Sequence, residues 1–172
     1  MRILPGVDVL ETRWVAGQVI MEEAGLTIVG NEFTDGDPAK TKSIVSDYLQ
    51  RGDIDGIWMD AGATAVAAIE AFEDAGVEVP PITGEDQQDF LQKWSDDGLT
   101  AVAPTYPTYQ WRTAIIAAAK ILAGEEIPKE WLLPEPVVTA DNLADYLQPD
   151  MPPLHYALCG CEDMPNFPDA WQ

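Results

Sequence analysis

Short apolar runs alternate with longer segments of helical periodicity as far as Gly124, and this alternation restricts the fold more than any other feature. Strands separated by helices of about 10 to 15 residues need crossover connections, which produce a parallel sheet with helices on both faces. We therefore predict an α/β fold, a three-layer α/β/α lobe of flavodoxin-like type with a mostly parallel sheet. Strands are expected at residues 2–4, 26–29, 54–59, 79–83 and 99–103, and helices at 9–24, 37–52, 65–76, 90–98 and 108–123.

The alternation stops after Gly124, and the rest of the chain is rich in proline. Here we expect one strand at 131–133, one short helix at 141–147, and a tail, 140–172, that wraps over a finished body. Both cysteines, Cys159 and Cys161, lie in this tail together with the single histidine, His155. A zinc site needs more ligands than these three residues supply. We therefore interpret the cysteines as ordinary thiols or one local disulfide, and we expect no metal site.

The charge of the chain excludes several classes of partner. Thirty acidic residues stand against nine basic residues, which gives a formal net charge of −21 over 172 residues, the length of one domain. Binding to nucleic acid or to an anionic membrane needs clustered Lys and Arg, so we expect neither. No apolar run approaches the roughly 18 residues of a membrane span, and no secretory signal is expected within this sequence.

Polar and aromatic residues follow the predicted strands at the edge where the carboxyl ends of parallel strands meet, which we call the rim. Arg13 lies early in the first helix, Asp60 and Asp86 follow the third and fourth strands, and Thr105 and Tyr106 follow the fifth. Carboxylates accept hydroxyl hydrogens, arginine donates to ring and hydroxyl oxygens, and aromatic faces pack on C–H surfaces. The combination predicts a site for a neutral polyhydroxylated ligand.

Each rim residue also has a purely structural interpretation, which the sequence leaves open. Asp60 and Asp86 precede predicted helices, where aspartate commonly caps free N–H groups. Arg13 could form a solvated pair with a neighbouring carboxylate, which contributes little stability. Tyr106 could simply be covered by the tail. The set of residues is therefore more informative than any single member.

The rim carries no recognisable catalytic signature. There is no Gly-rich phosphate loop with its lysine and no GxSxG elbow. A receiver-type phosphoacceptor at Asp60 would need several acids after the first strand and a lysine after the fifth. Only Asp8 meets the first need, and residues 101–112 contain no lysine. We therefore expect no enzymatic activity and no cofactor.

Five segments carry a family resemblance: EFTDGDPAK (32–40), IDGIWMDAGATA (54–65), ITGED (82–86), TAVAP (100–104) and KILAGEEIP (120–128). In this order they resemble the second half of type 1 periplasmic sugar-binding proteins, the ribose-binding-like substrate-binding components of ABC importers. The likeness extends from about residue 4 to residue 139. It implies that residues 1–139 form the C-terminal lobe of a clamshell whose two α/β lobes close over a sugar.

The resemblance implies a role for each rim residue. Arg13 matches the family's sugar-binding arginine, and Asp60 matches the polar residue that ends the central strand. Asp86 matches the aspartate of the G-x-D segment, which grips sugar hydroxyls. Pro104 departs from the family where a hinge-side amide binds, so Thr105 or Tyr106 would have to supply that contact.

The resemblance also implies a periplasmic protein that binds a sugar or polyol and meets an ABC transporter permease. The first lobe would precede Met1, so we expect a truncated protein whose half-site binds weakly. Residues 108–127 would pack on that first lobe. Without it, this helix either folds back on its own sheet or pairs with a second copy, and the short, stiff segment 104–107 favours a homodimer.

A second class of function stays open at this point. The chain could be a stand-alone flavodoxin-like interaction or signalling domain that uses its acidic rim to bind a protein or a metal. An upstream segment encoding another α/β lobe would distinguish the two functions.

Overall fold

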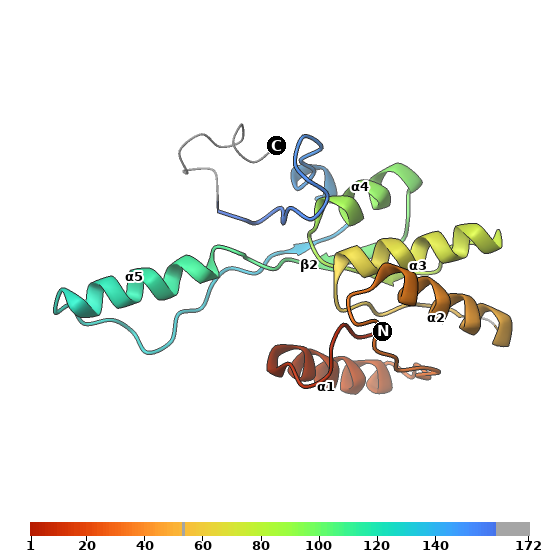
Figure 1. Ribbon diagram of the computed structural model, residues 1–172, viewed down its shortest axis with the longest axis horizontal. Coiled ribbons are helices and arrows are strands. Elements are labelled where there is room, and N and C mark those ends of the chain that lie inside the picture. The colour runs from red at the N-terminus through yellow and green to blue at the C-terminus, as the bar shows by residue number, and fades with distance from the viewer. Residues whose placement is uncertain (53, 161–172) are drawn as a thin grey trace.

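The computed structural model describes residues 1–52 and 54–160, and its elements alternate as the sequence predicts (Figure 1). All five predicted helices are present, each within a few residues of its expected bounds. None of the described helices is long and apolar enough to cross a bilayer. The elements are α1 (Asp8–Glu23), α2 (Pro38–Arg51), α3 (Gly62–Ala75), β1 (Ile82–Thr83), α4 (Gln88–Asp97), β2 (Ala101–Pro104), α5 (Gln110–Leu122), β3 (Val137–Val138) and the 3₁₀ turn η1 (Leu143–Asp145).

The sheet is mostly parallel, as predicted. Strand β1 pairs with β2 in parallel, and β3 pairs with β2 antiparallel. Single parallel bridges join Arg2 to Phe33 and Ile57 to β1, and the Met1 amino group donates to the Trp58 carbonyl oxygen at 2.5 Å. The five parallel segments therefore follow the 2-1-3-4-5 order of flavodoxin-like folds, and β3 adds an antiparallel edge.

The predicted strand at 54–59 is reduced to a single bridge, and a side chain explains why. The Thr83 hydroxyl accepts a hydrogen bond from the Met59 N–H at 2.8 Å and donates to the Met59 carbonyl oxygen at 3.0 Å. Backbone groups that would continue the ladder are thus satisfied by a hydroxyl. The segment still runs beside β1, so it places the residues after it as a full strand would.

Three other predictions of local structure were wrong. Residues 26–29 form no strand, because they pair with no neighbour, and Leu26 and Val29 are exposed. Residues 131–133 also form no strand, and the chain returns to the sheet later, at β3. The Pro136 carbonyl oxygen there accepts from both the backbone N–H and the hydroxyl of Thr105. The short helix expected at 141–147 is only the turn η1.

Helices α2, α3 and α4 cover one face of the sheet, with α3 packed between the other two. Alanine on α3 permits this close approach, since Ala65 and Ala68 are fully buried. Phe72 of α3 meets Phe90 and Leu91 of α4 in one apolar core. In Figure 1, α4 lies above β2 and α1 lies below it. This packing fixes the loops that precede α3 and α4, and those loops carry the rim.

The other face of the sheet is only partly covered. Helix α1 reaches it through Trp14, whose ring lies 5.6 Å from the ring of Trp58. A hollow of about 830 Å³ remains between α1, the segment 25–30 and the sheet, and apolar side chains such as Met21 and Val102 line much of it. Helix α5 does not fill this hollow but projects away from the body as an arm, with no buried residue (Figure 1).

Loss of the aspartate cap on α2 should destabilise the fold measurably. Asp37 Oδ1 accepts hydrogen bonds from the N–H groups of Ala39 at 2.8 Å and Lys40 at 3.4 Å. We expect Asp37→Ala to lower the free energy of unfolding by about 0.5 to 2 kcal/mol in urea denaturation. The matched control is Asp47→Ala, an exposed position inside the same helix, which should change stability much less. Equal losses in the two variants would contradict the capping role.

Candidate ligand-binding site

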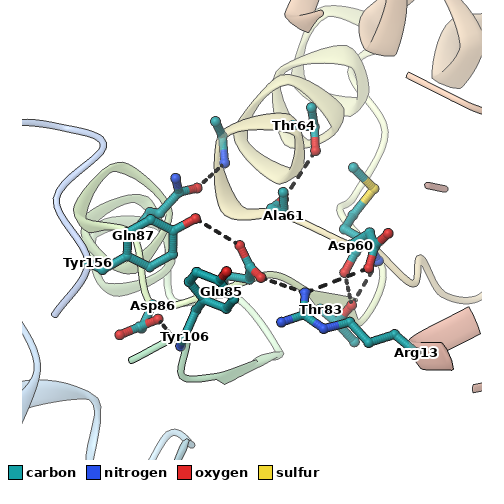
Figure 2. A network of polar contacts seen from close by, with 12 residues as sticks. Arg13, Asp60, Ala61, Thr64, Thr83, Glu85, Asp86, Gln87, Tyr106 and Tyr156 are labelled. Carbon is teal, nitrogen blue, oxygen red and sulfur yellow. Dashed lines mark hydrogen bonds and ion pairs between the residues drawn. The ribbon is translucent and has the colours of Figure 1, made fainter. Parts of the chain in front are cut away.

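Four side chains from separate segments meet at the carboxyl ends of the parallel strands (Figure 2). Arg13 comes from α1 and Asp60 from the loop before α3. Glu85 comes from the loop after β1, and Tyr106 from the loop after β2. The parallel sheet order places these loops side by side. The sequence predicted that the side chains of Arg13, Asp60 and Asp86 would converge at one edge; Arg13 and Asp60 meet there, whereas the Asp86 side chain turns onto backbone amides.

Arg13 lies at the centre of this group. Its Nη1 atom is 2.7 Å from Glu85 Oε1 and 3.8 Å from Asp60 Oδ1, and its guanidinium lies over the ring of Tyr106, 5.6 Å from the centroid. Burial by itself lowers the pKa of Arg13, but the hydrogen bond and charge of Glu85, with the charge of Asp60, raise it overall. About a third of the Arg13 side chain is exposed, so a charged donor faces solvent at the rim.

Asp60 is the least satisfied group of the site. Its side chain is fully buried, and neither carboxylate oxygen has a hydrogen-bond partner of good geometry. Burial raises the pKa of Asp60, and the nearby Arg13 charge offsets only part of that shift. Buried polar groups without partners are costly and are concentrated at functional sites. Asp60 therefore keeps hydrogen-bonding capacity that the ion pair with Arg13 and the nearby Ile3 amide do not fully use.

Asp86 and Thr105 lie at the same edge, but internal bonds occupy their polar atoms. Asp86 is fully buried, and its Oδ1 and Oδ2 accept from the backbone N–H groups of Tyr106 at 2.7 Å and Leu158 at 3.0 Å. Burial raises the pKa of Asp86, and these two amides offset part of the rise. The Thr105 hydroxyl donates to Pro136. Their predicted contacts with a ligand stay predictions.

Sequence reasoning missed two residues of the site. Glu85 stands beside Asp86 after a predicted strand, and this position is a usable signal for a site residue. Burial raises the pKa of Glu85, while the hydrogen bond from Arg13 lowers it. Tyr156 donates from its hydroxyl to Glu85 Oε2 at 3.1 Å. No local pattern could reveal this contact, because 71 residues separate the pair.

The described residues contain no group of three or more His, Cys, Asp or Glu that could hold a metal ion. Cys159 is disulfide-bonded, in line with one of the two interpretations that the sequence left open. Cys161 lies outside the described residues.

Ionised Asp60 should destabilise the fold near neutral pH. Because its pKa is raised in the folded state, this penalty is absent below the ordinary aspartate pKa of about 3.9 and grows as the pH rises through the folded-state value. We expect Asp60→Asn to melt at a higher temperature than wild type at neutral pH, with the difference vanishing in acid. Thermal melts across this pH range measure the effect, with exposed Asp47→Asn as the control. A difference that stays constant with pH would exclude Asp60 as its source.

The fold is a mostly parallel α/β lobe with polar and aromatic side chains at its strand ends, the edge at which such sheets bind ligands. Comparison with known families agrees, since a family model described as a periplasmic binding protein domain matches residues 8–126. The chain therefore belongs to the periplasmic binding protein family. Among curated proteins, none matches the chain significantly.

Solved structures of the same architecture resemble this lobe. An ABC transporter solute binding protein from Agrobacterium vitis with bound D-fucose shares 26% identity, with a TM-score of 0.71 over 83% of this chain and 51% of that one. One from Bacillus halodurans C-125 with bound myo-inositol shares 22%, with a TM-score of 0.75 over 85% and 52%. A periplasmic one from Actinobacillus succinogenes 130z with bound D-allose shares 23%, with a TM-score of 0.71 over 84% and 53%. The chain spans about half the length of these proteins.

Proposed function

We propose that this chain is the C-terminal lobe of a substrate-binding component of an ABC importer and that its rim binds a sugar or polyol. The observation that carries the proposal is the pairing of a buried carboxylate, Asp60, whose oxygens have no hydrogen bond of good geometry, with the partly exposed guanidinium of Arg13 at 3.8 Å. The bound D-fucose, myo-inositol and D-allose of the similar structures support this ligand class. Family membership favours it over a stand-alone signalling domain.

The rim would bind such a ligand by three kinds of contact. The free N–H groups of Arg13 would donate to ring or hydroxyl oxygens, and Asp60 would accept hydroxyl hydrogens once the side chains that cover its buried oxygens move aside. The exposed part of Tyr106 would pack against a C–H face of the ring. Asp86 and Thr105 would contact ligand only if they released the backbone groups that they now bind, so in the closed site they would mainly support Tyr106.

Several properties of the whole protein follow from this proposal. Residues 1–139 would be the lobe, residues 140–172 its tail, and the segment 108–127 would pack on a first lobe. The protein would act in the periplasm and deliver its ligand to a permease. The family consists of binding proteins, and we propose no reaction at this rim. A turnover of sugar that disappears in Asp60→Asn would contradict this.

We further propose that the 172-residue chain forms a homodimer through α5. The arm is exposed along its length and carries Trp111, Ile115, Ile116, Ile121 and Leu122. It does not fold back on its own sheet, which removes one of the two solutions expected from the sequence. Pairing between copies would cover these side chains of the arm. Burial of each large side chain contributes about 1.5 to 3 kcal/mol.

Thermal shift measurements with a panel of sugars and polyols test the proposed function. Ligands that bind the folded state raise the melting temperature in proportion to RT ln(1 + [L]/Kd). We expect stabilisation by at least one of myo-inositol, D-allose, D-fucose or another pentose, hexose or polyol at millimolar concentration. No shift with any member of the panel, together with no change in amide chemical shifts, would contradict the proposal.

A further inference from the structure

The segment 153–158 of the tail packs directly against the loop that carries Glu85. The backbone of Tyr156 forms an antiparallel bridge with Gln87, and the Ala157 N–H donates to the Asp86 carbonyl oxygen at 2.8 Å. The first turn of α4 is held as well, because the Gln88 N–H donates to the His155 carbonyl oxygen at 2.9 Å. The tail therefore forms one wall of the rim.

Tyr156 joins this wall to the ligand-binding residues through two contacts (Figure 2). Its hydroxyl donates to Glu85 Oε2 at 3.1 Å, while Glu85 Oε1 accepts from Arg13 at 2.7 Å. Its ring lies 5.5 Å from the ring of Tyr106, over which the Arg13 guanidinium rests. The contacts thus form a ring of four side chains, in which each touches the next: Arg13, Glu85, Tyr156 and Tyr106.

We propose that Tyr156 is a positioning residue of the sugar site, which fixes Glu85 and Tyr106 so that both hold Arg13 in one orientation. The inference rests on the proposed function. Glu85 is nearly buried, and each of its oxygens has one partner. With only Nη1 of Arg13 engaged by carboxylates, the remaining N–H groups of the guanidinium stay free for ligand oxygens. A preorganised donor loses less entropy when the ligand binds.

The family match gives this inference a consequence for specificity. The match ends at residue 126, so Tyr156 lies outside the part of the chain that the family model describes. Arg13 and Asp60 lie inside it. The tail would therefore add a determinant of its own to a binding site built from the shared lobe, and exchanging the tail should change which sugars are preferred.

Tyr156→Phe tests the inference because it removes the hydroxyl but keeps the ring. In ligand-free protein, we expect NMR titration of the Glu85 carboxyl carbon to show a raised pKa, since the Tyr156 hydrogen bond lowers that pKa. The Arg13 guanidinium resonances can be assigned by their disappearance in Arg13→Lys. In Tyr156→Phe they should show faster rotation of the guanidinium group. With the best ligand of the sugar panel, affinity should fall about five- to tenfold, which is less than the loss of a direct hydrogen bond to a charged group, because Tyr156 acts on the ligand only through Glu85 and Tyr106.

Tyr48→Phe is the matched control, because Tyr48 donates to the exposed Glu32 at 3.0 Å in a different part of the molecule. It should change neither Arg13 nor the affinity. In a double-mutant cycle, Tyr156→Phe and Glu85→Gln should be clearly non-additive, since one acts through the other. An unchanged Glu85 pKa and unchanged Arg13 rotation in Tyr156→Phe would overturn the inference, as would unchanged affinity. A wild type that binds no sugar would instead overturn the proposed function, and the ligand-free readouts would still decide the positioning role.

Discussion

Arg13→Leu is expected to lose all detectable response to the sugar that stabilises the wild type. Arg13 supplies the charged donors of the rim, and a hydrogen bond to a charged group contributes about 1.5 to 3 kcal/mol. Its loss also removes the cation that lowers the pKa values of Asp60 and Glu85 most strongly, which disfavours their ionised, accepting forms. Together these effects should weaken binding by about 100-fold or more, which places a weak half-site beyond detection by calorimetry.

Two further variants separate the role of Arg13 from a general effect of charge. Arg13→Lys keeps the positive charge but lacks the planar fork, so it should retain part of the affinity. Arg51→Leu removes an exposed arginine that contacts Tyr48 at the end of α2, and its binding should equal that of wild type. If Arg13→Leu binds as tightly as wild type, Arg13 is not a ligand-binding residue.

Ile116→Asp is expected to convert a dimer of this chain into a monomer. Ile116 lies on the arm α5, and the helix combines exposed apolar side chains with two cations, Arg112 and Lys120, and no acid. Such a helix can approach a second copy of a strongly acidic chain without adding to the repulsion between them. A carboxylate buried in that contact is costly, so the dissociation constant of the dimer should rise about 100-fold or more. Equilibrium ultracentrifugation at micromolar concentration measures the mass.

The matched control for this prediction is Ile20→Asp. Ile20 is more exposed than Ile116 but lies on α1, away from the arm, so the variant changes charge and hydrophobicity in the same way. It should remain a dimer. A wild type with the mass of one chain, or a dimer that survives Ile116→Asp, would contradict an interface through α5.

Helices and their ends could be predicted because the signals are local. Asp37 followed by Pro38 marks the start of α2, and the structure has this cap in place. Gly76 and Gly98 end α3 and α4 with positive φ values of 66° and 61°, a conformation that glycine adopts without strain. The order of strands and helices then fixed the sheet edge at which Arg13, Asp60 and Tyr106 meet.

The predictions that were wrong or incomplete concern features that depend on contacts between distant segments. The apolar run at 26–29 is typical of a buried strand, but burial requires a neighbour, and that side of the sheet has an open hollow. Asp86 and Glu85 are adjacent with similar chemistry, yet the fold turns Asp86 onto two backbone amides and Glu85 onto Arg13. Contacts from distant segments separate these roles: Tyr106 and Leu158 hold Asp86, while Arg13 and Tyr156 hold Glu85.

Amide NMR titration of the wild-type chain with myo-inositol, D-allose and D-fucose tests the central claim most directly, because it locates the bound ligand as well as detecting it. The account predicts concentration-dependent shifts confined to the loops that follow the strands, centred on Asp60, Glu85 and Tyr106, and absent in Arg13→Leu. Shifts centred instead on the hollow beside α1, or on the exposed surface of α2, would contradict a sugar site at the rim.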